Sequence, residues 1–237
     1  MERKEIVKFA ASLLDDLNNF LAMQTENGKI IIECTKQACE HLGNANLIAM
    51  CALSSAIIRK NLEPGNTSES ISKRFVLSAS FFQGVDLCQK SIMEGNYIQA
   101  AALLKQEMET IAAIEEAKSN VRTEKKVPNV KHVKWNLNIL YGRLNKAAHV
   151  ADSQLLNKLI QTDPIGNTAP ASAVPLFNKD TAKGLYGLHV TLLIQLAIQL
   201  NDLYLEAYGE GLTDTELACI AEAFKLLLED GWLVLDD

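Results

Sequence analysis

Residues 184–200 read GLYGLHVTLLIQLAIQL and form the most apolar stretch of the chain. Three polar side chains, His189, Gln195 and Gln199, interrupt the run. It is too short, and too often interrupted by polar residues, for a membrane span, which needs about 20 predominantly apolar residues. Its leucines recur at intervals of three and four residues, as on a helix that is buried on several sides. The stretch therefore predicts a core helix, which we expect to cover about 180–208.

The same helical period continues on both sides of this stretch, and no segment alternates convincingly with period two. Glycine and proline separate most of the segments. We expect helices over about 4–24, 29–62 (with a bend at Gly43), 68–94, 97–123, 130–149, 152–161, 180–208 and 214–230. The sequence thus predicts an all-α fold, a single multi-helix bundle of about seven to nine helices without significant sheet. We expect one domain over 1–237, with a long proline-rich loop at 162–178.

The composition fits a globular protein and excludes disordered and fibrous classes, since 48% of the 237 residues are hydrophobic and 22% are charged. No unbroken apolar run follows a positively charged start, so no secretory signal is predicted. Five cysteines at irregular spacing in apolar surroundings are typical of free buried thiols in a reducing compartment. We expect a soluble cytoplasmic protein without membrane association; the membrane alternative rests on 184–200 alone.

Several familiar sites are missing from the sequence. No histidine has a glutamate three residues before it, and there is neither an HExxH motif nor a Cys-x-x-Cys pair. A phosphate-binding GxxxxGK[ST] loop and a GxSxG nucleophile motif are also absent. We therefore predict no cofactor and no metal. His189 lies in the apolar helix and is interpreted as a core histidine rather than a ligand.

The segment from Asn129 to His149 has an unusual polar face. On a helix, one face would carry the apolar side chains Val133, Leu137, Leu140, Leu144, Ala147 and Ala148. The opposite face would carry Trp135, Asn138, Gly142, Asn145 and His149, with Tyr141 at its edge. Aromatic, amide and imidazole groups suit partial burial and directed hydrogen bonding. Either this helix is central and buried on two sides, with His149 a satisfied core or capping residue, or the face binds or transforms a substrate.

Positive charge gathers in the same region. The stretch 118–146 contains one acidic residue, Glu124, and eight basic residues: Lys118, Arg122, Lys125, Lys126, Lys131, Lys134, Arg143 and Lys146. Its net charge is therefore +7. Since the whole chain carries −6, the remaining 208 residues carry −13. A local basic block on an acidic protein can attract phosphate backbones. The alternative is an ordinary solvated turn between helices, where lysines are common.

The run from Arg143 to His149, RLNKAAH, resembles the Arg-x(4–6)-His element of HEPN-type helical bundles. The segment from Gly95 to Glu109 is similar to a helix of uncharacterised bacterial bundles, which carries two leucines, a basic residue and a glutamate. The corresponding positions here are Leu103, Leu104, Lys105 and Glu109, followed by Tyr141, Leu144 and His149. The resemblance covers about 95–150, under a quarter of the chain.

Active HEPN proteins are metal-independent ribonucleases that work as dimers with paired Arg/His sites. The resemblance therefore implies that His149 is the general acid–base and that Arg143 holds the scissile phosphate. Asn145 and Lys146 would help to position the RNA backbone. On a straight helix Arg143 and His149 would lie about 120° and 9 Å apart, so they converge only at a helix end or across a dimer.

Four further residues complete the candidate binding set. Tyr141 and Asn138 lie on the polar face, while Lys105 and Glu109 form an i, i+4 pair that is either a surface ion pair or an anchor for a neighbouring helix. The expected partners are RNA, a protein partner or a second copy of the chain. The alternative function is a non-catalytic bundle that binds a protein or a small molecule. That alternative predicts a buried, fully hydrogen-bonded His149.

Overall fold

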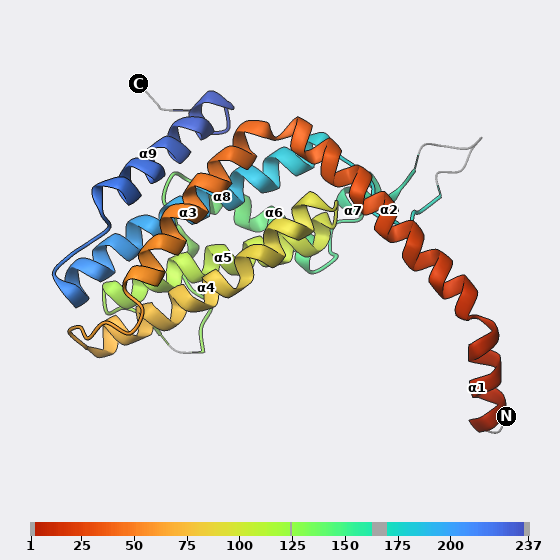
Figure 1. Ribbon diagram of the computed structural model, residues 1–237, viewed down its shortest axis with the longest axis horizontal. Helices are drawn as coiled ribbons and strands as arrows, with labels where there is room; N and C mark the ends of the chain where they lie inside the picture. The colour runs from red at the N-terminus through yellow and green to blue at the C-terminus, as the bar shows by residue number, and fades with distance from the viewer. Residues whose placement is uncertain (1–2, 124, 163–169, 235–237) are drawn as a thin grey trace.

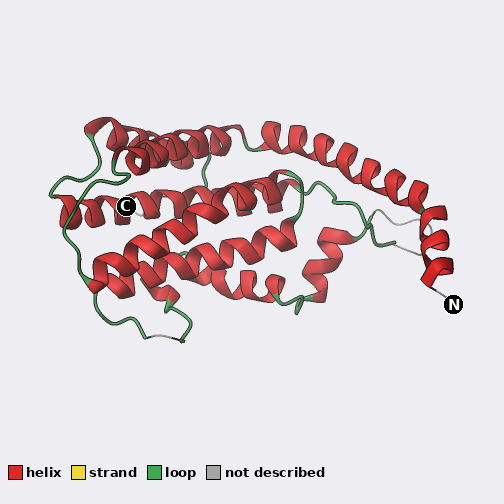
Figure 2. Cartoon of the chain, turned by 60° about the horizontal axis from the view of Figure 1, so that its bottom comes forward, coloured by secondary structure: helices red, strands yellow, loops and turns green. Residues whose placement is uncertain are grey.

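The computed structural model describes residues 3–123, 125–162 and 170–234. In this part of the chain there are nine α-helices and one 3₁₀ turn: α1 (Arg3–Ser12), α2 (Leu14–Ala38), α3 (Glu40–Arg59), α4 (Glu69–Met93), α5 (Tyr97–Lys118), η1 (Val130–His132), α6 (Asn138–Ala148), α7 (Ser153–Ile160), α8 (Lys179–Tyr208) and α9 (Asp214–Glu229). Helices make up nearly all of the regular structure (Figure 2). The described residues contain no strand, only an isolated bridge between Gln161 and Ala171. The prediction of an all-α bundle is confirmed.

Helix α8 is the centre of the bundle, as 184–200 predicts. Every residue from Tyr186 to Ala197 is buried, and α3, α4, α5 and α9 pack around the helix (Figure 1). The helix ends where Gly209 adopts a left-handed conformation with φ 75°, which glycine tolerates without a steric penalty. By length and composition alone α3 and α8 could each cross a membrane. In α8, however, 78% of the 18-residue apolar stretch that meets this criterion is buried inside the protein.

Each polar residue that interrupts the apolar run of α8 has a specific partner in the core. His189 contacts Glu107, and the amide nitrogen of Gln199 donates to the carbonyl of Ile111. The Gln195 side chain bonds both backbone groups of Lys134. The Gln195 Oε1 accepts from the Lys134 N–H, and the Gln195 Nε2 donates to the Lys134 carbonyl. Buried polar groups need such partners because an unpaired one costs its full desolvation free energy. The interruptions therefore connect α8 to its neighbours.

The link from Gln195 to Lys134 explains why the predicted helix over 130–149 is wrong in its first half. A turn, η1, is followed by Trp135 and Asn136, both with positive φ, and the helix α6 begins only at Asn138. The Lys134 N–H donates to a side chain instead of to a helix turn, and the Lys134 carbonyl accepts from the Gln195 amide as well as from the Leu137 N–H. The predicted apolar face holds nevertheless, since Val133, Leu137, Leu144 and Ala147 are buried.

The helix boundaries near the N-terminus also differ from the prediction. We expected a break at Asn27-Gly28 and a bend at Gly43, but α2 runs through the first and α3 through the second. One glycine inside a helix costs only about 1 kcal/mol, which packing readily offsets. Here the Asn27 side-chain amide donates to the carbonyl of Pro175. The chain instead breaks at Leu13 and at Cys39.

Residues 5–30, which we call the arm, project from the bundle as α1 and the first part of α2 (Figure 1). The first buried side chain along the described chain is Ile31, which lies against Gly95. The arm exposes ten large apolar side chains: Ile6, Val7, Phe9, Leu13, Leu14, Leu17, Phe20, Leu21, Met23 and Ile30. So many exposed apolar side chains in one segment are unusual for a soluble monomer.

The proline-rich loop predicted at 162–178 lies partly outside the described residues, which omit 163–169. Its two ends approach each other where the N–H of Thr162 donates to the carbonyl of Pro170 and the N–H of Ser172 donates to the carbonyl of Ile160. The loop returns to the bundle at Asn178, whose side chain caps α8 by accepting from the Thr181 N–H. These bonds fix where the loop leaves α7 and where it enters α8.

Candidate functional site

Arg143 lies in the middle of α6, and His149 lies at its C-terminal end. Both side chains are exposed, and neither makes a hydrogen bond or an ion pair with any described residue. Leu144 and Ala147 between them are buried and hold the helix against α5. His149 ends the helix, and only its backbone N–H is bonded, to the carbonyl of Asn145. The structure thus presents both predicted catalytic side chains to solvent without bringing them into contact with each other.

Lys105, Glu109 and Tyr141 form a cluster between α5 and α6. The Tyr141 hydroxyl donates to Glu109 Oε1 over 2.5 Å, and Lys105 Nζ lies 3.2 Å from the same oxygen. Lys105 Nζ also lies 5.9 Å from the centre of the Tyr141 ring. Burial, and then the bond to Glu109, raise the pKa of Tyr141 to about 12. Of the two sequence-based alternatives for Lys105 and Glu109, the geometry corresponds to an anchor for a neighbouring helix.

The other predicted binding residues lie around this cluster on α6. Asn138 begins the helix and Asn145 follows two turns later, both half-buried. Lys146 is exposed. No side-chain hydrogen bond joins any of these three to another described residue. Their polar groups are available on the same helix as Arg143 and His149.

The basic block divides into two groups by its contacts. Lys118 forms an ion pair with Asp202, and Arg122 pairs with Glu116 and donates to two carbonyl oxygens of its own loop. These two cations support the fold. The other six are exposed and form no ion pair with a carboxylate of the described residues: Lys125, Lys126, Lys131, Lys134, Arg143 and Lys146. Positive charge is therefore left available along 125–146.

An apolar cavity of about 260 Å³ lies beside Arg143, between α5, α6, α7 and α8. Its walls come mainly from leucines and from Tyr97 and Trp232. Three charged side chains also line it: Arg143, Lys158 and Asp180. Since four helices and the C-terminal segment contribute to the walls, no local sequence pattern reveals this cavity.

A second, more open hollow of about 490 Å³ lies between α4 and the end of α5. Lys73, Arg122 and Lys125 line it together with Val76 and Leu77. Two of these three cations belong to the basic block. Of the three, Arg122 is paired with Glu116 and Lys73 with Glu69, so among the described residues Lys125 alone adds uncompensated charge.

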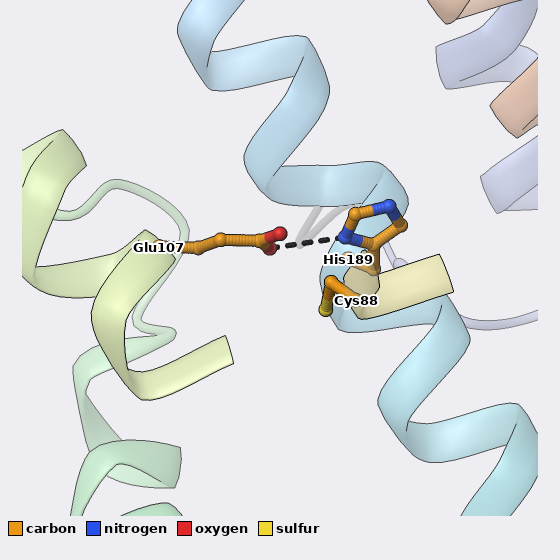
Figure 3. Close-up of side chains that lie close together, drawn as sticks. All are labelled: Cys88, Glu107 and His189. Carbon is orange, nitrogen blue, oxygen red and sulfur yellow. Dashed lines mark hydrogen bonds and ion pairs between the residues drawn. The ribbon is translucent and has the colours of Figure 1, made fainter. Parts of the chain in front are cut away.

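Three chemically reactive side chains meet in the core: Cys88 of α4, Glu107 of α5 and His189 of α8 (Figure 3). All three are buried, and His189 Nδ1 lies 3.0 Å from Glu107 Oε2. Burial, and then the neighbouring Glu107, raise the pKa of the Cys88 thiol far above its usual range. Sequence spacing does not connect His189 with Glu107, because 82 residues separate them. Helical spacing places each residue on an inner face but does not show which inner faces meet.

The expectation of five buried cysteines is only partly correct. Cys39 and Cys88 are buried, whereas Cys34 and Cys219 are half-buried and Cys51 is exposed on α3. All five thiols are free.

Comparison of the chain with protein-family models, curated proteins and solved structures gives no match. Functional inference therefore depends on the residues and geometry of this chain.

Proposed function

We propose that the protein binds RNA along the basic block and cleaves it without a metal, with His149 as the general acid–base and Arg143 as the phosphate ligand. The observation that carries the proposal is the set of six exposed cations over 125–146, which have no carboxylate partner among the described residues and are followed in the chain by the exposed His149. Unpaired cations can neutralise phosphates and release their counterions, whereas paired cations must first lose their carboxylates.

The chemistry suits both side chains. An imidazole titrates near neutral pH and so accepts and returns a proton, and a guanidinium binds two phosphate oxygens at once. In metal-independent cleavage the 2′-hydroxyl loses its proton and attacks the adjacent phosphorus, while the departing 5′-oxygen gains a proton. One His149 serves as base or acid, and the His149 of a second copy supplies the other role. The HEPN-like resemblance implies such a dimer.

Fluorescence anisotropy with a labelled single-stranded oligoribonucleotide tests the binding part. The double substitution Lys131→Glu and Lys134→Glu should weaken binding at low salt and reduce the salt slope by about 0.7 for each lost phosphate contact. The double substitution Lys36→Glu and Lys90→Glu makes the same charge change on α2 and α4, where both lysines have acidic partners. Equal losses in the two variants would show that only net charge matters, and would overturn the proposal.

The catalytic part has its own test. RNA cleavage in the presence of a chelator should fall at least a hundredfold in His149→Ala, in line with the loss of a general acid–base. His41→Ala is the matched control, because His41 is an exposed histidine on α3, away from the block. Cleavage that is equal in wild type and His149→Ala would contradict the catalytic role while leaving RNA binding intact.

The cavity favours a second candidate function, the binding of a small molecule with an apolar body and an anionic end. Its apolar walls would take an aliphatic chain, and Arg143 and Lys158 would hold a carboxylate. Decanoate should change the fluorescence of Trp232 in a Trp135→Phe background, and decanol should bind more weakly. Lys158→Gln separates the two functions, since Lys158 lines the cavity but lies outside the basic block. It should weaken decanoate binding and leave RNA binding unchanged.

A further inference from the structure

We propose that Cys88, Glu107 and His189 form a binding site for a divalent metal ion, most suitably Zn²⁺, in the core of the bundle. The three residues come from α4, α5 and α8, and the close-up in Figure 3 shows their side chains converging on one point between these helices. A thiolate, a carboxylate and an imidazole are the three side-chain ligands that zinc uses in proteins. This inference is independent of the proposed RNA function.

The distances between the donor atoms are close to those of a metal site. One donor atom from each residue lies within 4.8 Å of the other two, and His189 Nδ1 and Glu107 Oε2 are 3.0 Å apart. Around a tetrahedral ion with bonds of about 2.0–2.3 Å, neighbouring donors are separated by about 3.3–3.8 Å. The observed separations, 3.0 Å for one pair and at most 4.8 Å for the others, bracket this range.

The trio is incompletely satisfied by the protein itself. Glu107 Oε1 and His189 Nε2 are buried without a hydrogen-bond partner among the described residues. A carboxylate in such a site costs free energy unless a positive charge compensates it. With Zn²⁺ bound, one thiolate, one carboxylate and a neutral imidazole give a site with no net charge. The ion would thus compensate the carboxylate and give its free oxygen a second possible contact.

A small cavity of about 20 Å³ lies beside Glu107, between α4 and α5, with Gly84 and Leu103 among its lining residues. It adjoins the trio at Glu107 alone, since neither Cys88 nor His189 lines it. A volume of about 10–15 Å³ is enough for one water molecule. Three protein ligands plus water would complete a four-coordinate site.

Metal binding must displace the proton of the Cys88 thiol, which is released to solvent as the sulfur–zinc bond forms. Affinity should therefore rise with pH, as for other thiolate ligands. Since the three ligands lie on three different helices, and 82 residues separate Glu107 from His189, the unfolded chain has no preformed site. The ion binds the native state selectively and should stabilise it.

The test uses the full chain after removal of metals with a chelator. Titration with Zn²⁺ against a competing chromophoric chelator should give one tight site per chain. The melting temperature should rise by about 5–10 °C when free Zn²⁺ exceeds the dissociation constant a hundredfold. Co²⁺ in place of Zn²⁺ should produce a thiolate-to-cobalt charge-transfer band and the strong visible bands of tetrahedral coordination.

Cys88→Ser and Glu107→Gln keep the size of each side chain and should weaken Zn²⁺ binding at least tenfold, and Cys88→Ser should also abolish the charge-transfer band. Cys51→Ser is the matched control, because Cys51 is an exposed thiol outside the trio. It should behave as wild type. If Cys88→Ser fails to fold by circular dichroism, the cobalt spectrum of the wild type decides alone. Absence of a stoichiometric site, or a cobalt spectrum that Cys88→Ser leaves unchanged, would reduce the trio to a structural hydrogen-bonded cluster and overturn the proposal.

Discussion

The hydroxyl of Tyr141 donates to Oε1 of Glu109 over 2.5 Å and so connects α6, the helix with the candidate catalytic residues, to α5. Removing this hydroxyl in Tyr141→Phe should lower the free energy of unfolding by about 1–3 kcal/mol, as for a hydrogen bond to a charged group. Urea denaturation measures the change. Tyr208→Phe is the control, because the Tyr208 hydroxyl has no hydrogen-bond partner among the described residues. Equal effects of the two variants would contradict a specific role for the Tyr141 bond.

The ion pair between Glu216 of α9 and Arg59 of α3 should be sensitive to acid. Burial raises the pKa of this carboxyl, but bonds from Arg59, the Thr213 N–H and Ser55 outweigh burial and lower the pKa to about 2. A lowered carboxyl pKa contributes stability above its unfolded value of 4.5, and this contribution is lost as the pH falls toward 2. The free energy of unfolding should therefore decrease over this window, by roughly 2–3 kcal/mol from Glu216 alone.

Denaturation of wild type and Glu216→Gln at several pH values checks this dependence. The variant should be less stable near neutral pH, and its stability should vary less between pH 4.5 and 2. Glu222→Gln serves as the comparison, because Glu222 is an exposed residue on the same helix. An unchanged acid slope in Glu216→Gln would show that other carboxyl groups govern the transition.

The Trp232 ring of the C-terminal segment packs against Gly187 and leaves no room for a larger side chain at position 187. A Cβ added there would lie 2.4 Å from the Trp232 ring, whose Nε1 donates to Thr191. Gly187→Ala should displace the indole and lower the free energy of unfolding by about 1–3 kcal/mol, as for overpacked cores. Trp232 fluorescence in a Trp135→Phe background reports the displacement. Gly184→Ala, where a Cβ meets nothing within 4 Å, should leave the fluorescence unchanged.

The arm predicts self-association. Along α2 from its N-cap, Leu13, Leu17 and Phe20 follow steps of four and three residues, the pattern of a seam between paired helices. Because the arm is the same on every chain, a second copy offers the matching seam. Ten exposed large apolar side chains provide surface of the order needed for a stable dimer, about 800 Å² on each partner.

Sedimentation equilibrium tests this expectation. The double substitution Leu13→Glu and Leu17→Glu should shift the protein to monomer and leave the melting temperature of the bundle nearly unchanged, since both side chains are exposed. Leu87→Glu, at an exposed position on α4, should not affect association. A wild type that stays monomeric at every concentration would contradict the prediction.

Periodicity predicts the core better than it predicts the breaks between helices. The apolar spacing over 184–200 identifies α8, and that over 133–147 identifies buried side chains there even though the first third of that segment is not helical. The break itself depends on Gln195, which bonds Lys134 from 61 residues away. A local pattern contains no information about that contact.

The candidate sites also differ in whether the local sequence reveals them. Arg143 and His149 are recognisable because they are close in the sequence, and charge counting finds the basic block because its residues are consecutive. The trio of Cys88, Glu107 and His189 requires three helices to meet, and the cavity beside Arg143 requires four. In a bundle, side chains from different helices meet at positions that depend on crossing angles and helix rotation, which residue spacing does not specify.

The packing of α3 on α9 has a consequence for how the protein is made. These two helices contact each other extensively, yet more than 150 residues separate the end of one from the start of the other. As the chain leaves the ribosome, the apolar face of α3 stays uncovered until α9 has emerged. A nascent chain interrupted before residue 214 would lack α9 and leave the side of α3 that packs on it open to other chains. Newly made protein should therefore depend on chaperones for most of its synthesis, and chains truncated before α9 should aggregate.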